Sequence, residues 1–233
     1  MFIHYDPCSD GTAHNLKVMS AIDGGYNLPE QDVPILNWGK SSDLPKYSRV
    51  FNRKIVKDKL LALQIFKAAD VNVPEFWTDI NDIHRHKYPI LGRRKEHSCG
   101  TDICLLKCPA VHSFDYYSRF IPKVAEFRVH VIGSTSFISQ KLPFYSGDNP
   151  TCWNMRTGFM FRDINIYRSA RLTHAIRDMA YRAVRSLNYD FGAVDIIVDK
   201  YDEVYCLEVN SAPALAEHRI RKYIELIKFN FVR

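Results

Sequence analysis

The chain has 233 residues, 46% hydrophobic and 25% charged, a composition that excludes a disordered protein. The net charge of +6 suits a polyanion, either nucleic acid or nucleotide, and does not separate the two. No apolar run approaches the ~18 residues that span a membrane, the start does not resemble a signal peptide, and the six cysteines form no Cys-x-x-Cys pair. We therefore expect a cytoplasmic protein with reduced thiols, long enough for one large or two small domains.

The first 48 residues carry the weakest pattern of the chain. They predict a short helix over His14–Ala21, a short strand over Val33–Leu36 and a turn at Gly24-Gly25. A clearer helix follows, with Asp58 as its N-cap and an apolar face that includes Leu60 and Leu63. We expect it to end near Asp70, before an extended segment that leads to Pro74.

A basic loop comes next. Tyr88–Leu91 predicts a strand that runs into residues 92–101, where Arg93, Arg94, Ser98 and Gly100 lie. Such a loop can bind phosphates through backbone N–H groups and cations, although it lacks the order of a P-loop. An exposed basic loop that binds nucleic acid, or no ligand, is the alternative.

Two further segments follow, 116–122 and 125–133, and the second predicts a strand. Glu126, Arg128 and His130 alternate along the second segment, so they share one face of it. In isolation this pattern is also typical of an amphipathic strand whose charges face solvent, and we interpret His130 as structural.

The chain then predicts a strand over Ser134–Lys141, a long loop over Pro143–Gly158 and a helix over Ala170–Leu187, capped by Ser169. The apolar face of this helix repeats with helical period. Its arginines are most simply a solvated face.

Residues 191–215 predict a hairpin of strands Ala193–Val198 and Val204–Asn210. A loop closed symmetrically about Tyr201-Asp202 places Asp195 opposite Glu208. Alternation along the second strand places Cys206, Glu208 and Asn210 on one face. Two facing carboxylates repel each other unless a cation lies between them, and an all-oxygen ligand set suits Mg²⁺. A surface hairpin with its acids in water is the alternative.

This hairpin resembles the magnesium hairpin of the ATP-grasp superfamily, whose second strand ends in a similar Glu-x-Asn followed by a proline. The order of the other motifs resembles the same superfamily. The resemblance implies that Lys59, Arg93 or Arg94, Ser98 and Gly100 bind the phosphates of ATP, with the loop acting as a flap. It also implies that the backbone around Phe120 and Ile121 binds adenine and that Glu126 binds ribose.

The resemblance further implies Mg²⁺ on Asp195, Glu208 and Asn210, and catalytic roles for Arg128 and Arg156. Lys141 and Arg162 are further candidates for the γ-phosphate or the acceptor carboxylate. Many ligases of the superfamily carry an arginine two residues before the metal aspartate, and this chain has Ala193 there. The catalytic role of that arginine therefore falls to another residue or is absent.

The implied fold is α+β: two ATP-grasp subdomains, residues 49–114 and 115–233, that clasp the nucleotide, after a short N-terminal α/β region of residues 1–48. The implied activity is a carboxylate–amine ligase that uses ATP and Mg²⁺, forms an acylphosphate and releases ADP and phosphate. Its partners are a small-molecule or peptide carboxylate and an amine; no membrane is involved and nucleic acid is not required. Within the superfamily, the compact form with its Asn37-Trp38-Gly39 start resembles small members from bacteria and bacteriophages, whose acceptors are mostly undefined.

Two alternatives remain. A nucleotide-binding module without catalysis agrees with Ala193 and the short N-terminal region. A Mg²⁺-dependent nuclease agrees with the basic charge and the carboxylate pair, but the nuclease pattern has a lysine where this chain has Asn210.

Overall fold

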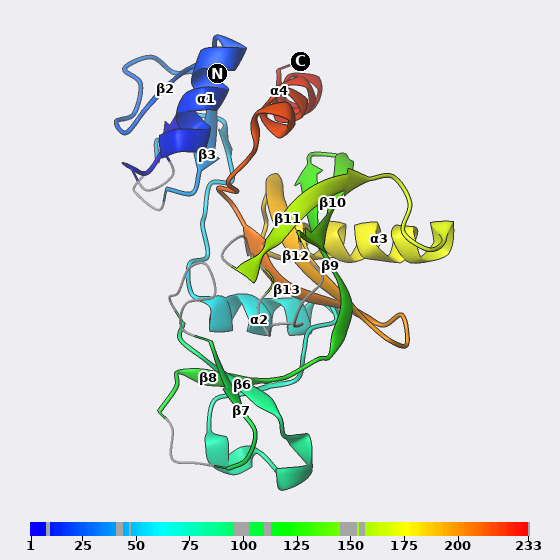
Figure 1. Ribbon diagram of the computed structural model, residues 1–233. Helices are drawn as coiled ribbons and strands as arrows, with labels where there is room; N and C mark the ends of the chain where they lie inside the picture. The colour runs from blue at the N-terminus through cyan, green and yellow to red at the C-terminus, as the bar shows by residue number, and fades with distance from the viewer. Residues whose placement is uncertain are drawn as a thin grey trace.

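The computed structural model describes residues 1–7, 10–40, 44–46, 48–95, 103–109, 113–144, 153 and 157–232. The described residues form three sheets (Figure 1). In space, a small parallel sheet of the N-terminal residues lies at one end, a five-stranded sheet lies in the middle, and a four-stranded sheet lies at the opposite end.

The N-terminal sheet has the order β2-β1-β3-β4 and is parallel throughout. Its strands and helix are β1 Phe2–Tyr5, α1 Asp10–Ser20, β2 Asp23–Gly25, β3 Ile35–Trp38 and β4 Val50–Phe51. The predicted helix thus begins earlier than expected, and the predicted strand lies two residues later. Gly24 belongs to β2 and not to a turn, because it lies against the backbone of Ile3, where a Cβ atom would meet the carbonyl oxygen at 2.7 Å.

The middle sheet is antiparallel, with the order β11-β10-β9-β12-β13. Its strands are β9 Lys123–Ile132, β10 Thr135–Pro143, β11 Phe159–Ile164, β12 Phe191–Asp199 and β13 Val204–Asn210. One face packs against α3, Ala170–Ser186, and α2, Lys59–Ala68 (Figure 1). Fully buried side chains such as Val194, Ile196 and Ile176 form the core between them. The opposite face carries the polar side chains described below.

Both predicted helix caps are confirmed. The carboxylate of Asp58 accepts hydrogen bonds from the N–H groups of Leu60 and Leu61. The hydroxyl of Ser169 accepts one from Leu172. Each cap satisfies N–H groups that have no partner inside the first helical turn, so each helix begins where the sequence predicts.

The third sheet has the order β5-β8-β6-β7. Its strands are β5 Phe76–Trp77, β6 Ile90–Arg93, β7 Cys104–Leu106 and β8 Tyr116–Arg119, with short 3₁₀ turns at Ile80–Asp82 and Arg85–Lys87. The strand predicted at 88–91 therefore lies two residues later, and Arg93 ends it instead of opening the loop. The division of the chain at residues 48 and 114 stays a prediction.

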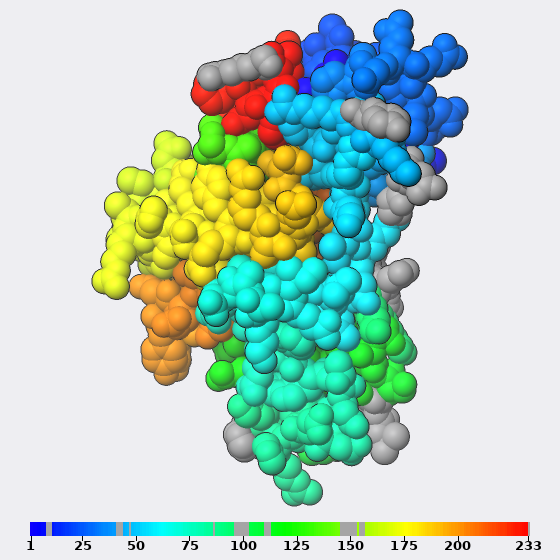
Figure 2. All heavy atoms as spheres, turned by 180° about the vertical axis from the view of Figure 1, so that it is seen from behind, coloured from blue at the N-terminus to red at the C-terminus, as the bar shows by residue number. Residues whose placement is uncertain are grey.

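The C-terminal helix α4, Glu217–Phe231, was not predicted. It packs beside α1, and both figures show it next to the N-terminal residues (Figures 1 and 2). Its buried Tyr223 and Ile227 share a core with Leu16 and Trp38. Near its end, Asn230 accepts a hydrogen bond from the backbone of Ser134 in the β9–β10 turn. The helix thus joins the first sheet to the middle one.

Candidate active site

A row of polar side chains crosses the middle sheet. Asp163 faces Ser139, Ser139 faces Arg128, Arg128 faces Asp195, and Asp195 faces Glu208. Facing residues in an antiparallel sheet point to the same side. These five residues, one from each strand, therefore form one line on the face opposite α3. We call this line the polar row.

The β12–β13 hairpin contains a bulge. Ile197 pairs with Tyr205 and Ile196 with Cys206, but the register shifts before Asp195, which pairs with Glu208. Leu207 is the extra residue. The predicted pairing of Asp195 with Glu208 is confirmed, although a regular ladder continued from the turn would have placed Leu207 opposite Asp195.

The same bulge makes one prediction wrong. Cys206 pairs with Ile196, so it does not share a face with Glu208 and Asn210. It lies in the core on the helix side of the sheet, and burial strongly raises the pKa of its thiol. An inserted residue exchanges the two faces of a strand, which period-two alternation does not anticipate.

Arg128 and Asp195 form a two-point ion pair at the centre of the row. Arg128 Nε and Nη2 donate to Asp195 Oδ1 at 2.7 Å and to Oδ2 at 2.8 Å. The Asp195 side chain is 8% exposed. Burial by itself would raise the pKa of Asp195, but Arg128 and Lys141 outweigh it and hold the pKa at about 2. The pair is therefore ionised over the physiological range.

Glu208 closes one end of the row. Lys59, the first residue of α2, donates to Glu208 Oε2 at 2.6 Å, and Asn210 Nδ2 donates to Oε1 at 3.1 Å. Burial and the neighbouring Asp195 both raise the pKa of the Glu208 carboxyl, but Lys59 and the Asn210 hydrogen bond leave it lowered. The lysine that the sequence assigns to phosphate thus lies directly on a predicted metal ligand.

Asp163 closes the other end. Its Oδ1 atom accepts hydrogen bonds from Ser139 Oγ at 2.7 Å and from Arg219 Nε at 2.8 Å. Arg219 Nη2 also donates to the carbonyl oxygen of Phe161 at 3.1 Å. Arg219 comes from α4 and is 7% exposed. Each end of the polar row is therefore held by a cation from a helix.

Sequence reasoning missed Arg219. The signal was present, because Ile220, Tyr223, Ile224 and Ile227 recur with helical period. Arg219 lies four residues before Tyr223 and so falls on the same inward face. A buried arginine on an apolar helix face indicates a charged partner.

Glu126 lies beside the polar row on β9, as predicted. It is 4% exposed and accepts from Lys123 through Oε2 at 2.6 Å and from Lys141 through Oε1. The predicted ribose glutamate is thus shared by two lysines. Phe120 donates its N–H to the Pro89 carbonyl at 3.4 Å, and the Ile121 side chain is buried.

The structure separates the two arginines that the sequence left equivalent. Arg93 Nε donates to Ser118 Oγ at 3.0 Å. Burial raises the pKa of Tyr116, and the charge of Arg93 offsets only part of that rise. Arg94 instead forms an exposed ion pair with Asp115 at 3.3 Å. Arg93 is therefore half-buried and bonded within the third sheet, whereas Arg94 lies at the surface. Ser98, Gly100 and Arg156 lie outside the described residues.

His130 is structural, as we interpreted it. It is buried, its Nδ1 lies 2.8 Å from the Tyr223 hydroxyl, and its ring stacks on Phe137. Burial lowers its pKa well below the ordinary value, and Arg128 and Arg219 lower it further.

The donor set fits a hard divalent cation. Among the described residues no group of three His, Cys, Asp and Glu side chains could hold a metal ion. Asp195 and Glu208 nevertheless supply two facing carboxylates, and Asn210 adds an amide oxygen beside them. The positive groups of Lys59 and Arg128 now lie against these oxygens, so the site already attracts cations. Mg²⁺ commonly binds one or two carboxylates together with substrate phosphates.

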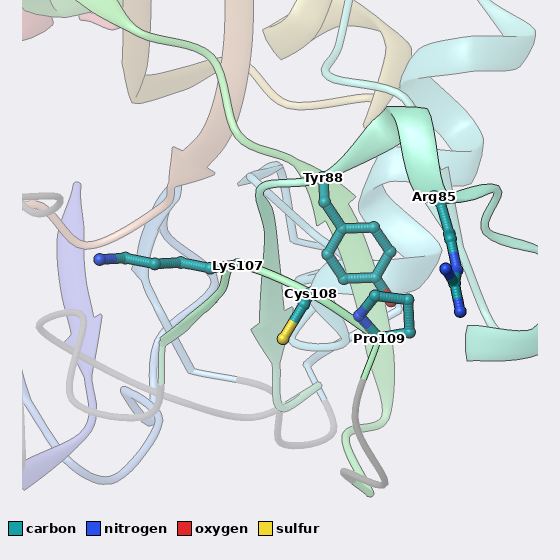
Figure 3. Close-up of a pocket in the computed structure, with 5 residues that line it drawn as sticks. All are labelled: Arg85, Tyr88, Lys107, Cys108 and Pro109. Atoms are coloured by element: carbon teal, nitrogen blue, oxygen red, sulfur yellow. The ribbon is translucent and has the colours of Figure 1, made fainter.

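Two surface cavities of about 400 Å³ each lie away from the polar row. One is lined by Arg85, Tyr88, Lys107, Cys108 and Pro109; Figure 3 shows Lys107 extending away from the tyrosine ring. The other lies between α3 and the start of β10, where Arg177 donates to the Ser136 carbonyl and Tyr181 to the Ser134 carbonyl. Neither cavity is lined by a residue of the polar row, so the chemistry of the row identifies the candidate site.

Comparison with solved structures shows the fold. The ATP-grasp ligase PsnB, complexed with its minimal precursor, superposes with a TM-score of 0.71 at 10% identity, covering 98% of each chain. D-alanine–D-alanine ligase from Bacillus anthracis gives 0.71 at 10% identity, covering 100% of this chain and 96% of that one. The macrocyclase MdnC from Microcystis aeruginosa, bound to precursor peptide MdnA, gives 0.56 at 11%, covering 92% and 93%.

The chain therefore has the α+β ATP-grasp fold that its motifs predict. No protein-family model and no curated protein matches it in sequence. Among the described residues, no helix has the length and apolarity needed to cross a bilayer.

Proposed function

We propose that the protein is an ATP- and Mg²⁺-dependent ligase that joins a carboxylate to an amine through an acylphosphate, releasing ADP and phosphate. The observation that supports this most is the pairing of Asp195 with Glu208 on one face, each in contact with a cation. Among the proteins of like fold, PsnB has been seen with Mg and ADP, and D-alanine–D-alanine ligase with ATP.

In this proposal Asp195, Glu208 and Asn210 hold magnesium, which neutralises the charge of the phosphates when bound. Lys59 then exchanges its present carboxylate partner for phosphate oxygens. Arg93 adds a second phosphate contact from β6. A cation that loses a buried partner must find another anion, so the ion pairs of the free protein prepare the phosphate site.

Glu126 binds the ribose hydroxyls, and the backbone near Phe120 and Ile121 borders the adenine. This places the nucleoside beside β9 and the phosphates along the polar row. The acceptor acid then lies beyond the γ-phosphate and attacks it, and the amine displaces the phosphate from the resulting acylphosphate. The protein contributes position and preorganised charge.

The acceptor is a small-molecule or peptide carboxylate, with an amine as the second substrate. Both PsnB and MdnC have been seen with precursor peptides, which motivates a peptide arm in any substrate screen.

The test is the identity of the products. A screen of carboxylates, amines and precursor-like peptides with ATP and Mg²⁺ is expected to give substrate-stimulated ADP and phosphate. With an ¹⁸O-labelled carboxylate, one labelled oxygen should appear in phosphate, because the acylphosphate breaks at its acyl carbon. AMP or pyrophosphate as product would contradict the acylphosphate route. Binding of ATP with no turnover across the screen would favour the non-catalytic module.

A further inference from the structure

Three cations surround the ring of Phe161 on β11. The charged groups of Arg128, Lys141 and Arg219 lie 4.8, 5.3 and 5.7 Å from the ring centre. They come from β9, β10 and α4, which are distant in sequence. Cations are attracted to an aromatic face, but three of them close together also repel one another.

The acids nearby do not fully balance these charges. Lys141 shares Glu126 with Lys123, Arg128 depends on Asp195, and Arg219 depends on Asp163. Under the proposed function Asp195 turns to magnesium, so Arg128 loses its partner. The surroundings of Phe161 then carry excess positive charge in a buried place, and an anion is needed there.

Arg219 can receive that anion. Its hydrogen bonds to the described residues use Nε and one N–H of Nη2. A guanidinium has five N–H donors, so donors remain on its Nη1–Nη2 edge. That edge matches the two oxygens of a carboxylate.

Arg219 also lies near the position where this chain lacks an arginine. Ala193 faces His130 on the polar side of the sheet. His130 Nδ1 lies 2.8 Å from the Tyr223 hydroxyl of α4, and Arg219 lies one helical turn before Tyr223 on the same buried face. Arg219 therefore comes from the helix that contacts the residue facing Ala193.

We propose that Arg219, together with Arg128 and Phe161, forms the subsite that binds the carboxylate of the acceptor acid. The inference rests on the proposed function and adds to it the residue that holds the second substrate. The aliphatic or aromatic part of the acceptor packs on the exposed part of Phe161.

The position of Arg219 favours the acceptor over the nucleotide phosphates. Glu208 and Asp163 are the two ends of a row across five strands, which are spaced about 4.8 Å apart. The metal carboxylates occupy the β12–β13 end of the row. Arg219 lies at the β11 end, on the far side of Arg128 from the metal carboxylates.

The experiment uses the full chain with saturating Mg²⁺ and ADP. The melting temperature is measured against acetate, as the carboxylate probe, and inorganic phosphate, at ionic strength held constant with chloride. In the wild type we expect acetate to add to the stabilisation by ADP. We expect the apparent acetate affinity to fall at least tenfold in Arg219→Gln and to recover in part in Arg219→Lys.

Two further variants separate binding from folding. Arg221→Gln is the matched control, because Arg221 lies on the exposed side of α4 and pairs only with Glu217 among the described residues. Asp163→Asn removes the carboxylate that competes for Arg219, so the acetate response should rise. If the Arg219–Asp163 pair were only a structural link, Asp163→Asn and Arg219→Gln would lose the response alike, and the inference would be wrong.

The outcomes distinguish the two proposals. If Mg²⁺ and ADP do not stabilise the wild type, the proposed function fails and this inference fails with it. If ADP stabilises but acetate adds nothing, or Arg219→Gln responds like the wild type, only the inference fails. A response to phosphate alone that is lost in Arg219→Gln would assign the subsite to phosphate and overturn the carboxylate assignment.

Discussion

Asp195 lies opposite Glu208 across the β12–β13 hairpin, and the extra residue Leu207 produces this pairing. Without magnesium, like charges in facing positions repel, and the structure offsets this with Arg128 on one side and Lys59 on the other. In the free chain these two ion pairs therefore offset the repulsion between the two carboxylates.

The first prediction concerns the metal. Glu208→Gln keeps the shape of the side chain but removes a charge from the predicted metal site. We expect it to abolish ADP formation and the Mg²⁺-dependent part of the ATP-induced rise in melting temperature. Glu203→Gln, an exposed change in the hairpin turn, is the control and should behave like the wild type. Equal Mg²⁺ dependence in both variants would show that the hairpin acids do not bind the metal.

The second prediction concerns the central ion pair. Arg128→Met leaves Asp195 buried without its partner, so the free energy of unfolding should fall by about 3–5 kcal/mol. Adding Asp195→Asn removes the uncompensated charge and should recover much of that loss. Urea unfolding of the two single variants and the double variant gives the coupling energy directly. Additive losses would show that the pair contributes nothing beyond its separate residues.

The third prediction separates Arg93 from Arg94. Arg93 is half-buried and bonds to Ser118, whereas Arg94 pairs with exposed Asp115. A lost charge-assisted contact to phosphate is worth about 1.5–3 kcal/mol, which weakens binding about tenfold or more. We expect that loss of affinity for Mg²⁺-ATP in Arg93→Gln and little change in Arg94→Gln, measured by calorimetry. The reverse order would move the phosphate contact to Arg94.

The fourth prediction concerns pH. The pKa of His130 in the folded protein lies well below its ordinary value of 6.5, because burial and two arginines oppose its charge. As the pH falls below 6.5, the histidine takes up a proton in the unfolded chain but not yet in the folded protein. The stability that is present above pH 6.5 is therefore lost progressively below it.

One such proton contributes at most about 1.4 kcal/mol per pH unit. His130→Phe, which keeps a ring beside Phe137, should flatten the fall in unfolding free energy between pH ~7.5 and ~5.5 by up to that slope. His174→Gln, at an exposed position of α3, is the control. An unchanged slope in His130→Phe would show that another group causes the acid sensitivity.

The sequence by itself determined the parts of the site that depend on local order. Asp58 and Ser169 cap the helices that they predict, because capping involves only the next few residues. The order of the motifs predicted the ATP-grasp fold, and alternation along β9 placed Glu126 and Arg128 on one face.

Only the tertiary structure decided the rest, because it depends on contacts between distant segments. The bulge at Leu207 moved Cys206 into the core, which no period along the strand could reveal. Arg93 and Arg94 have different hydrogen-bond partners, Ser118 and Asp115, and each partner is more than twenty residues away in sequence. Arg219 gains its place beside Phe161 from the packing of α4 across the sheet. A local pattern shows which face a side chain takes, but only the folded chain shows which charges meet there.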